Sequence, residues 1–228
     1  TLTATPIPRT LQASFVGLND LSIVATPPVL RQPIQTIVMP FEDERVREAL
    51  EREKRRGGQS FVVCPRVEDI EPMARKLARI VPHLSLGTVH GQMPADEVDE
   101  TMLRFTEGDG DILLATNIIE SGLDVPAANT MLVWHPDRFG LAQLHQLRGR
   151  VGRGTRRGMA YLLTEPGQTL APETERRLRT LEAMNRLGAG FQISARDLDL
   201  RGAGELLGEE QAGHLQLVGL SLYRHVLQ

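Results

Sequence analysis

The feature that most constrains the fold is a regular alternation of short apolar runs with longer amphipathic segments between residues 35 and 163. Each apolar run has the length of a buried strand, and the segments between the runs repeat apolar residues at helical spacing. In the segment 68–80, for example, Ile70, Met73 and Leu77 recur three or four residues apart. Strands that alternate with helices of about a dozen residues favour a parallel sheet with helices on both faces. We therefore predict an α/β fold.

The expected boundaries follow from these runs and from start and stop signals of helices. Gly57-Gly58 should end one helix, and Pro94 should lie in the first turn of another. The expected strands cover residues 35–39, 61–64, 86–89, 111–115, 130–134 and 159–163. The expected helices cover residues 42–56, 68–80, 94–105, 141–147 and 173–187, the last with Leu178, Leu181 and Leu187 turned inward.

Composition excludes several classes of protein. The 228 residues contain no apolar run long enough to cross a membrane and no signal peptide, so we expect a soluble cytoplasmic protein with no membrane partner. The single cysteine, Cys64, lies in an apolar run, which favours a reducing compartment and a buried, inert thiol. The six histidines show no ligand spacing with cysteine, so we predict no metal site.

The most basic stretch covers residues 148–157, which hold five arginines and no acidic residue. The whole chain has a formal net charge of −3, so any contact with nucleic acid must come from a local patch of this kind. Arg148, Arg150 and Arg153 alternate with glycines in this stretch. A guanidinium fork matches the geometry of phosphate, which favours a phosphate-binding turn over an ordinary basic loop.

The residues from Gln146 to Arg153 read Gln-x-x-Gly-Arg-x-Gly-Arg. This pattern resembles the last conserved motif of superfamily 2 helicases and translocases, which lies in their second RecA-like lobe. The resemblance implies that Arg150 and Arg153 are catalytic arginines that reach the γ-phosphate of ATP. It also implies that Gln146 binds the nucleotide.

A second candidate loop covers residues 116–126 (TNIIESGLDVP) and follows an apolar strand. Gly122 permits close approach of the backbone to a ligand, and Asp124 can accept a hydrogen bond from a ribose hydroxyl. A helix cap followed by a turn explains the same residues. The loop resembles the helicase motif that touches both nucleotide and nucleic acid, which implies that Gly122 and Asp124 bind nucleotide and that Thr116 binds DNA.

Two further loops occupy places where the helicase family contacts DNA phosphate. Arg66 follows the strand expected at 61–64, and His90 and Gln92 follow the strand expected at 86–89. A turn or a helix cap explains each loop about as well. Because ligands of parallel sheets bind at the carboxyl ends of the strands, we expect the candidate loops to gather at that edge of the sheet.

The first residues also resemble a helicase segment. Thr3-Ala4-Thr5 resembles the Ser/Thr-Ala-Thr motif that couples the two motor lobes of these enzymes. The resemblance implies that Thr3 and Thr5 belong to the end of the first lobe and that the chain starts there.

The last part of the chain changes character, because residues 195–213 are dense in glycine and charge. This stretch resembles the translocation motif shared by RecG-type fork helicases and bacterial transcription-repair coupling factors. The resemblance assigns Arg201 and Gln211 to that motif, and the neighbouring residues 209–211 and 218–223 look closer to the coupling factors. It implies a connector over residues 1–34, a second RecA-like lobe over 35–166 and a small helical hairpin and loop extension over 167–228.

The function implied by the resemblance is that of one motor lobe of an ATP-dependent translocase on double-stranded DNA, which removes stalled RNA polymerase and couples transcription to nucleotide excision repair. The implied partners are double-stranded DNA, the first RecA-like lobe, RNA polymerase and excision-repair proteins. ATP and Mg²⁺ are the implied cofactors, held mainly by the first lobe. The alternatives are a lobe of a RecG-type branch-migrating helicase and a non-catalytic nucleic-acid-binding lobe.

The division of labour between two lobes leads to an expectation about the isolated chain. The 228 residues contain no Gly-x-x-x-x-Gly-Lys-Ser/Thr sequence and no Asp-Glu-x-x box placed to hold Mg²⁺. Such segments cradle the phosphates and position the attacking water in enzymes of this kind. We therefore expect no ATP hydrolysis from these residues alone.

Overall fold

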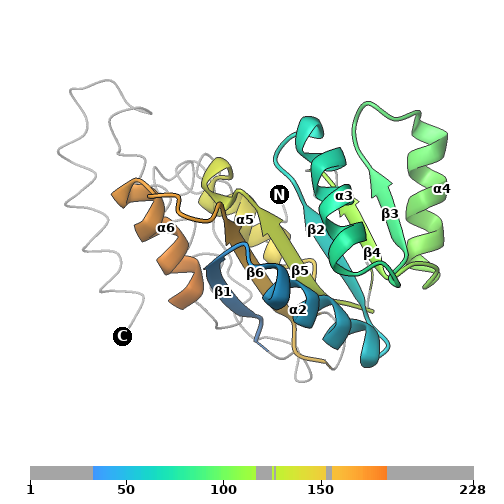
Figure 1. The fold of residues 1–228 in the computed structure, drawn as a ribbon, viewed down its shortest axis with the longest axis horizontal. Helices are drawn as coiled ribbons and strands as arrows, with labels where there is room; N and C mark the ends of the chain where they lie inside the picture. Colours follow the sequence, from blue (N-terminus) through green and yellow to red (C-terminus); the bar gives the residue numbers. More distant parts are fainter. Residues whose placement is uncertain (1–32, 117–124, 126, 153–155, 184–228) are drawn as a thin grey trace, which may run out of the picture. The chain divides into compact units, whose positions relative to one another are not determined.

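The computed structural model describes residues 33–116, 125, 127–152 and 156–183. These residues form a six-stranded sheet in which every neighbouring pair is parallel, with the strand order β1-β6-β5-β2-β4-β3 (Figure 1). The strands are β1 (Gln35–Pro40), β2 (Gln59–Val63), β3 (Leu86–Val89), β4 (Ile112–Ala115), β5 (Ala128–Trp134) and β6 (Met159–Thr164). The predicted parallel sheet is confirmed.

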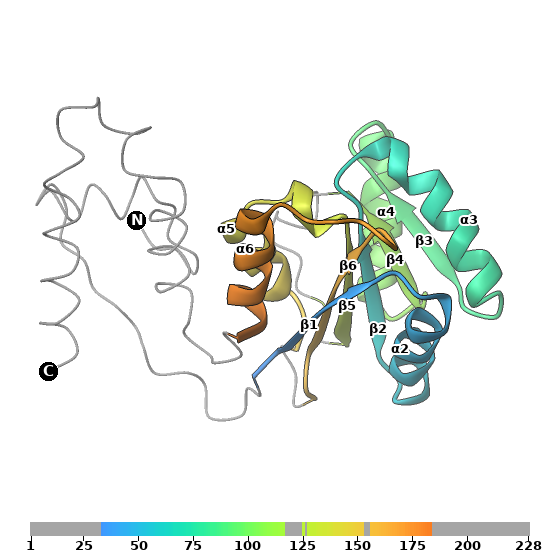
Figure 2. The same ribbon diagram turned by 60° about the vertical axis from the view of Figure 1, so that its left-hand side comes forward.

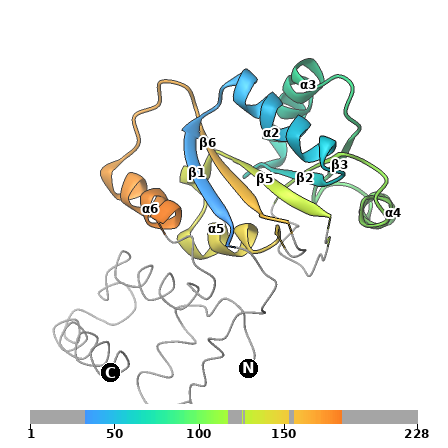
Figure 3. The same ribbon diagram turned by 90° about the horizontal axis from the view of Figure 1, so that it is seen from below.

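Five α-helices of the described part cover the two faces of this sheet. They are α2 (Asp43–Arg55), α3 (Ile70–Ile80), α4 (Ala95–Thr106), α5 (Leu141–Arg148) and α6 (Pro172–Ala183). Two short 3₁₀ turns, η1 (Val67–Asp69) and η3 (Pro136–Arg138), precede α3 and α5. Helices α2 and α3 lie on one face, and α4, α5 and α6 lie on the other (Figures 2 and 3). The predicted helices on both faces are confirmed.

Each face of the sheet carries its own apolar layer. On the α2–α3 face, Val46 and Leu50 of α2 and Leu77 of α3 pack in one buried cluster with strand residues such as Leu132. On the other face, the rings of Phe61 on β2 and Phe105 on α4 stand 5.4 Å apart. All five residues of β2 are buried, as expected for a central parallel strand covered on both sides.

Cys64 follows β2 inside this core and is fully buried. Burial, with a contribution from the nearby Asp69 carboxylate, raises the pKa of the Cys64 thiol to about 12. The expected burial of Cys64 is confirmed, and a thiol that stays protonated at neutral pH is a poor nucleophile.

Helix α2 ends where its glycines predict. Gly57 has a φ of +68°, and its N–H donates to the carbonyl of Lys54 at 2.9 Å. The N–H of Gly58 donates to the carbonyl of Glu53, also at 2.9 Å. This pair of bonds is a Schellman cap, which needs the left-handed conformation that glycine adopts without strain. The cap fixes the last turn of α2 at the start of β2.

Helix α6 packs against β1 and α5 and so belongs to the same compact unit as the sheet. Leu178 and Leu181 are each 1% exposed, which confirms their predicted inward orientation. The carboxylate of Glu182 accepts the N–H of Val38 at 3.1 Å and so covers a donor of the edge strand β1.

Some sequence predictions fall outside the described residues. These are the lobe-coupling residues Thr3 and Thr5, the translocation-motif residues Arg201 and Gln211, and the inward position of Leu187. Within the described part, no helix is long and apolar enough to cross a membrane.

Candidate nucleotide and nucleic-acid sites

The predicted site residues divide between the two edges of the sheet. We call the edge where the strands end the carboxyl edge, and the edge where they begin the amino edge. Arg66, His90 and Thr116 follow β2, β3 and β4 at the carboxyl edge. The arginine turn, residues 149–157, follows α5 and precedes β6, so it lies at the amino edge. The expectation that all candidate loops gather at the carboxyl ends is therefore wrong for the arginine turn.

The reason for this division is the direction of α5. The helix starts after the carboxyl end of β5 and runs back across the sheet, so its last turn reaches the amino edge (Figure 3). The N–H of Gly152 donates to the carbonyl of Ala128, the first residue of β5, at 3.3 Å. This hydrogen bond places the residues after α5 beside the start of β5.

At the carboxyl edge, three neighbouring strands bring their following residues into a row. Ala115 of the middle strand β4 is in register with Val63 of β2 and with Val89 of β3. Thr116 follows in the middle and is 8% exposed, with Arg66 following β2 and His90 following β3 on its two sides. The Thr116 hydroxyl and the His90 imidazole thus directly follow β4 and β3, and Arg66 lies three residues after the end of β2; their contact with DNA phosphate stays a prediction.

Local contacts orient two of these side chains. The guanidinium of the exposed Arg66 donates to the Glu68 carboxylate at 2.6 Å. This hydrogen bond and the accompanying attraction lower the pKa of Glu68 and raise that of Arg66. Nδ1 of His90 accepts the N–H of Gln92 at 3.4 Å, and the Gln92 side chain is exposed.

At the amino edge, the two ends of the arginine turn touch. Gly152 has a φ of +66°, and a Cβ placed on it would lie 2.9 Å from the Cα of Gly158. Only glycine fits this conformation and this contact without moving the main chain. The loop that carries Arg153 is therefore closed at its base, although Arg153 itself lies outside the described residues.

Two of the candidates assigned to ATP lie on this turn or directly before it. Gln146 is in the last turn of α5, Arg150 lies two residues past the end of that helix, and both are partly exposed. Ala128, which accepts the N–H of Gly152, donates its own N–H to the carbonyl of Val125 at 3.0 Å. Gly122 and Asp124 lie outside the described residues.

Arg148 differs from the other arginines of the motif because its side chain is directed into the fold. It is 6% exposed and donates to the Leu181 carbonyl at 3.2 Å and to the Thr36 hydroxyl at 3.5 Å. Leu181 belongs to α6, so Arg148 joins α6 to α5 and β1.

His145 on α5 is held neutral by its surroundings. Burial, with repulsion from the Arg148 guanidinium, lowers the pKa of His145 from 6.5 to about 4. Its Nδ1 atom is buried and has no hydrogen-bond partner within the described part of the chain. His145, which directly precedes the motif, therefore packs as a neutral side chain at neutral pH.

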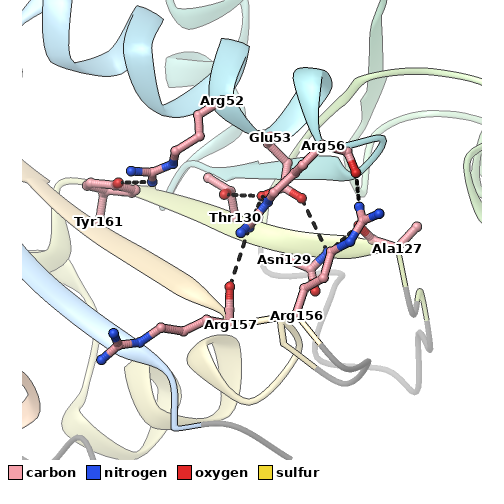
Figure 4. A network of polar contacts seen from close by, with 9 residues as sticks. All are labelled: Arg52, Glu53, Arg56, Ala127, Asn129, Thr130, Arg156, Arg157 and Tyr161. Atoms are coloured by element: carbon pink, nitrogen blue, oxygen red, sulfur yellow. Dashed lines mark hydrogen bonds and ion pairs between the residues drawn. The ribbon is translucent and has the colours of Figure 1, made fainter.

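Sequence reasoning missed one buried charge at the amino edge, the carboxylate of Glu53. It contacts Arg56, Asn129 and Thr130 (Figure 4). A signal for it exists in the sequence, because Glu53 continues the inward spacing that Val46 and the following apolar residues of α2 begin. A charged residue on the buried face of a helix indicates a partner inside the fold.

Comparisons with known proteins agree on the type of domain. The helicase conserved C-terminal domain family matches residues 42–155. The transcription-repair-coupling factor of Myxococcus xanthus is 50% identical over 228 residues, which cover 100% of this chain and 19% of that protein. The transcription-repair-coupling factor of Bacillus subtilis strain 168 is 47% identical with the same coverage. The chain thus spans about a fifth of the length of these relatives.

Solved structures give the same answer. The structure of RecG bound to a three-way DNA junction superposes with a TM-score of 0.74 and 39% identity, over 94% of this chain and 30% of that one. Dbp5 of S. cerevisiae, bound to RNA and ADP BeF3, superposes with a TM-score of 0.57 over 87% of this chain and 54% of that one, but at 15% identity it supports the RecA-like fold alone. The chain belongs to the helicase conserved C-terminal domain family and is similar over its whole length to the transcription-repair-coupling factors.

Proposed function

We propose that this chain is the second motor lobe of an ATP-dependent translocase on double-stranded DNA, in a bacterial protein that removes stalled RNA polymerase in the cytoplasm and couples transcription to excision repair. The observation that carries the proposal is the hydrogen bond between Gly152 and Ala128. It joins the arginine turn to the end of the loop with Gly122 and Asp124. The whole-chain similarity to the coupling factors supports the choice of protein.

In this proposal the amino edge faces ATP. Arg150 and Arg153 stabilise the negative charge that develops on the γ-phosphate in the transition state. Gln146, Gly122 and Asp124 contact the rest of the nucleotide. The first lobe supplies the phosphate-cradling loop and the Mg²⁺ ligands, and Thr3 and Thr5 couple the two lobes.

The carboxyl edge faces DNA in the same proposal. Arg66, His90, Gln92 and Thr116 contact backbone phosphates, which hold a duplex without reading its sequence. Because a rigid sheet separates this edge from the arginine turn, closure of the lobes on ATP moves the DNA contacts as one body. Arg201 and Gln211 then transmit that movement to the duplex.

The test is Arg150→Ala in the full-length protein, with Arg153→Ala beside it. Loss of an arginine finger lowers turnover by about 10³–10⁵-fold, and ATP binding should be largely retained. Arg157→Ala is the matched control, since its contact to Arg56 uses the main-chain carbonyl and survives the substitution. Equal mild effects of all three variants would show that the turn is an ordinary basic loop.

The isolated 228-residue chain gives a second test. It should hydrolyse no ATP with or without DNA, because the phosphate-cradling and metal-holding residues are not among its residues. DNA-stimulated turnover by the purified chain would contradict the proposed division between the lobes.

A RecG-type helicase lobe is the second candidate, and 39% identity to RecG over 94% of the chain favours it. The full-length protein decides between the two. Displacement of a stalled polymerase, with weak action on a branched DNA, indicates a coupling factor. Efficient branch migration with no polymerase displacement indicates a RecG-type helicase.

A further inference from the structure

The carboxylate of Glu53 is buried at the amino edge and bonded through both oxygens. The Glu53 residue is 0% exposed. Its Oε2 accepts the Thr130 hydroxyl at 2.5 Å and Nε of Arg56 at 3.0 Å, and its Oε1 accepts the Asn129 amide at 3.3 Å (Figure 4). A buried carboxylate is tolerated only when a cation and several donors satisfy it. These contacts therefore fix the end of α2 to the start of β5.

Arg56 extends this arrangement to the arginine turn. Its guanidinium, held by Glu53, also donates to the carbonyl of Arg157 at 3.4 Å. In the opposite direction, the guanidinium of Arg156 donates to the carbonyl of Arg56. The two segments thus exchange side-chain to main-chain hydrogen bonds, which fix the backbone at residues 156 and 157 (Figure 4).

The same carboxylate orders both sides of the turn. Residues 156 and 157 lead into Gly158, which touches Gly152 on the side where the chain enters the turn. Gly152 is bonded to Ala128, the residue before Asn129. Asn129 in turn donates to the carbonyl of Ala127 at 2.9 Å, at the end of the loop with Asp124. Glu53 is therefore linked by hydrogen bonds and contacts to both segments assigned to the nucleotide, the arginine turn and the end of the loop with Asp124.

We propose that Glu53 and Arg56 are positioning residues for the arginine turn: they hold the main chain at residues 156 and 157, beside the closed Gly152–Gly158 base, so that Arg150 meets the γ-phosphate. This inference rests on the proposed function. Neither side chain contacts a reacting group, and both act through the backbone at residues 156 and 157. The contacts of Glu53 and Arg56 with the turn are called the clamp below. Misplacement of a catalytic group by about 1 Å costs on the order of 100-fold in rate, so loss of the clamp lowers kcat and leaves ATP binding in place.

The experiment compares three variants of the full-length protein. Arg56→Met removes the bond to Arg157, Arg56→Lys keeps the positive charge beside Glu53, and Glu53→Gln removes the negative charge at constant shape. Arg52→Met is the matched control. Arg52 belongs to the same helix, but its guanidinium donates to the Tyr161 hydroxyl at 2.5 Å, away from the turn. The measurements are kcat and KM for ATP, the Kd for duplex DNA and the melting temperature.

We expect Arg56→Met and Glu53→Gln to lower kcat by about 10–100-fold at unchanged KM and DNA affinity. Arg56→Lys should recover part of the loss, and Arg52→Met should keep the wild-type kcat. If Arg56→Met keeps the wild-type kcat, or if Arg52→Met lowers kcat equally, the clamp does not position the turn. Should Glu53→Gln fail to fold, Arg56→Met still decides, because the Arg56 side chain is 27% exposed.

These outcomes separate the inference from the proposed function. If Arg150→Ala keeps full turnover, the proposed function fails whatever the clamp does. If Arg150→Ala abolishes turnover and Arg56→Met changes nothing, only the clamp fails.

Discussion

The two edges of the sheet are built differently. At the carboxyl ends of β2 and β3, the candidate DNA contacts lie on short loops, with Arg66 exposed and paired to an exposed Glu68. At the amino edge, buried polar side chains bond the main chain from several directions. The Gln59 amide, for example, donates to the carbonyls of Phe105 at 2.8 Å and Gly110 at 2.9 Å. At the edge assigned to nonspecific phosphate binding, candidate side chains such as Arg66 are exposed to solvent. At the edge assigned to the γ-phosphate, buried side chains hold the main chain in place.

Asp111, which directly precedes β4 at the amino edge, also bonds the main chain through its side chain. Its carboxylate accepts the Ser85 N–H at 2.9 Å, the Ser85 hydroxyl at 3.0 Å and the Lys54 ammonium at 2.5 Å. Burial alone would raise the pKa of Asp111, but the bonds to Lys54 and Ser85 outweigh it and lower the pKa overall. The main chain at this edge is thus held by side-chain contacts such as those of Gln59 and Asp111.

The largest predicted difference between the edges concerns glycine. Gly152→Ala places a Cβ 2.9 Å from the Gly158 main chain at a φ of +66°, so it should lower the free energy of unfolding by about 3 kcal/mol. A Cβ on Gly91, at the carboxyl edge, meets nothing within 4 Å, so Gly91→Ala should change stability by less than about 0.5 kcal/mol. Urea unfolding of both variants measures the two changes in the free energy of unfolding. Equal changes would contradict the predicted difference between the edges.

The next predicted effect is a pH dependence of the free energy of unfolding, caused by His145 on α5. The pKa of His145 is about 4 in the folded protein against 6.5 for an ordinary histidine. Between these values the unfolded chain takes up a proton that the folded chain does not. Stability due to this residue is therefore complete above pH 6.5 and falls as the pH drops to 4, by about 3 kcal/mol.

Substitution of this residue isolates its contribution. His145→Gln should flatten the stability profile between pH 6.5 and 4, while any loss at pH 8 reports packing alone. Parallel profiles for the variant and the wild type would mean that other groups cause the acid sensitivity.

The smallest effect compares arginines from the two edges. Arg66→Ala in the full-length protein should reduce the salt dependence of duplex binding by about 0.9 in the slope of log K against log salt, the value for one phosphate contact. Arg156→Ala should leave the slope unchanged, because Arg156 lies at the amino edge and donates to the Arg56 carbonyl. A change of slope for Arg156→Ala alone would place the duplex at the other edge.

The sequence predicted the fold well because the signals for its elements are local. Helix α2 runs from Asp43 to Arg55 where residues 42–56 were expected, and β3 has the expected bounds. Apolar periodicity and the Gly57-Gly58 stop report on the few residues around them. Strand β5 begins two residues before its expected start, because Asn129 is a buried polar residue in a run expected to be apolar.

The sequence predicted the arrangement of the site less well. The motif around Arg150 was recognisable, but its edge of the sheet depends on the direction of α5, which no residue of the motif encodes. The inward orientation of Arg148 and the burial of Glu53 depend on partners such as Leu181 and Thr130, which lie 33 and 77 residues away in the chain. Contacts over such separations leave no periodic pattern.

Gly58 has a consequence for how this domain can change in evolution. A Cβ on Gly58 would collide with the Glu53 carboxylate and lie 3.1 Å from the Ala127 carbonyl. A smaller residue at position 53 would make room, but on its own it leaves the buried Thr130 hydroxyl without its acceptor and Arg56 without its carboxylate partner. A Cβ at position 58 is thus tolerated better beside a smaller residue at position 53 than beside Glu53. The two positions form an epistatic pair, and a lineage that holds Glu53 and Gly58 is expected to keep both.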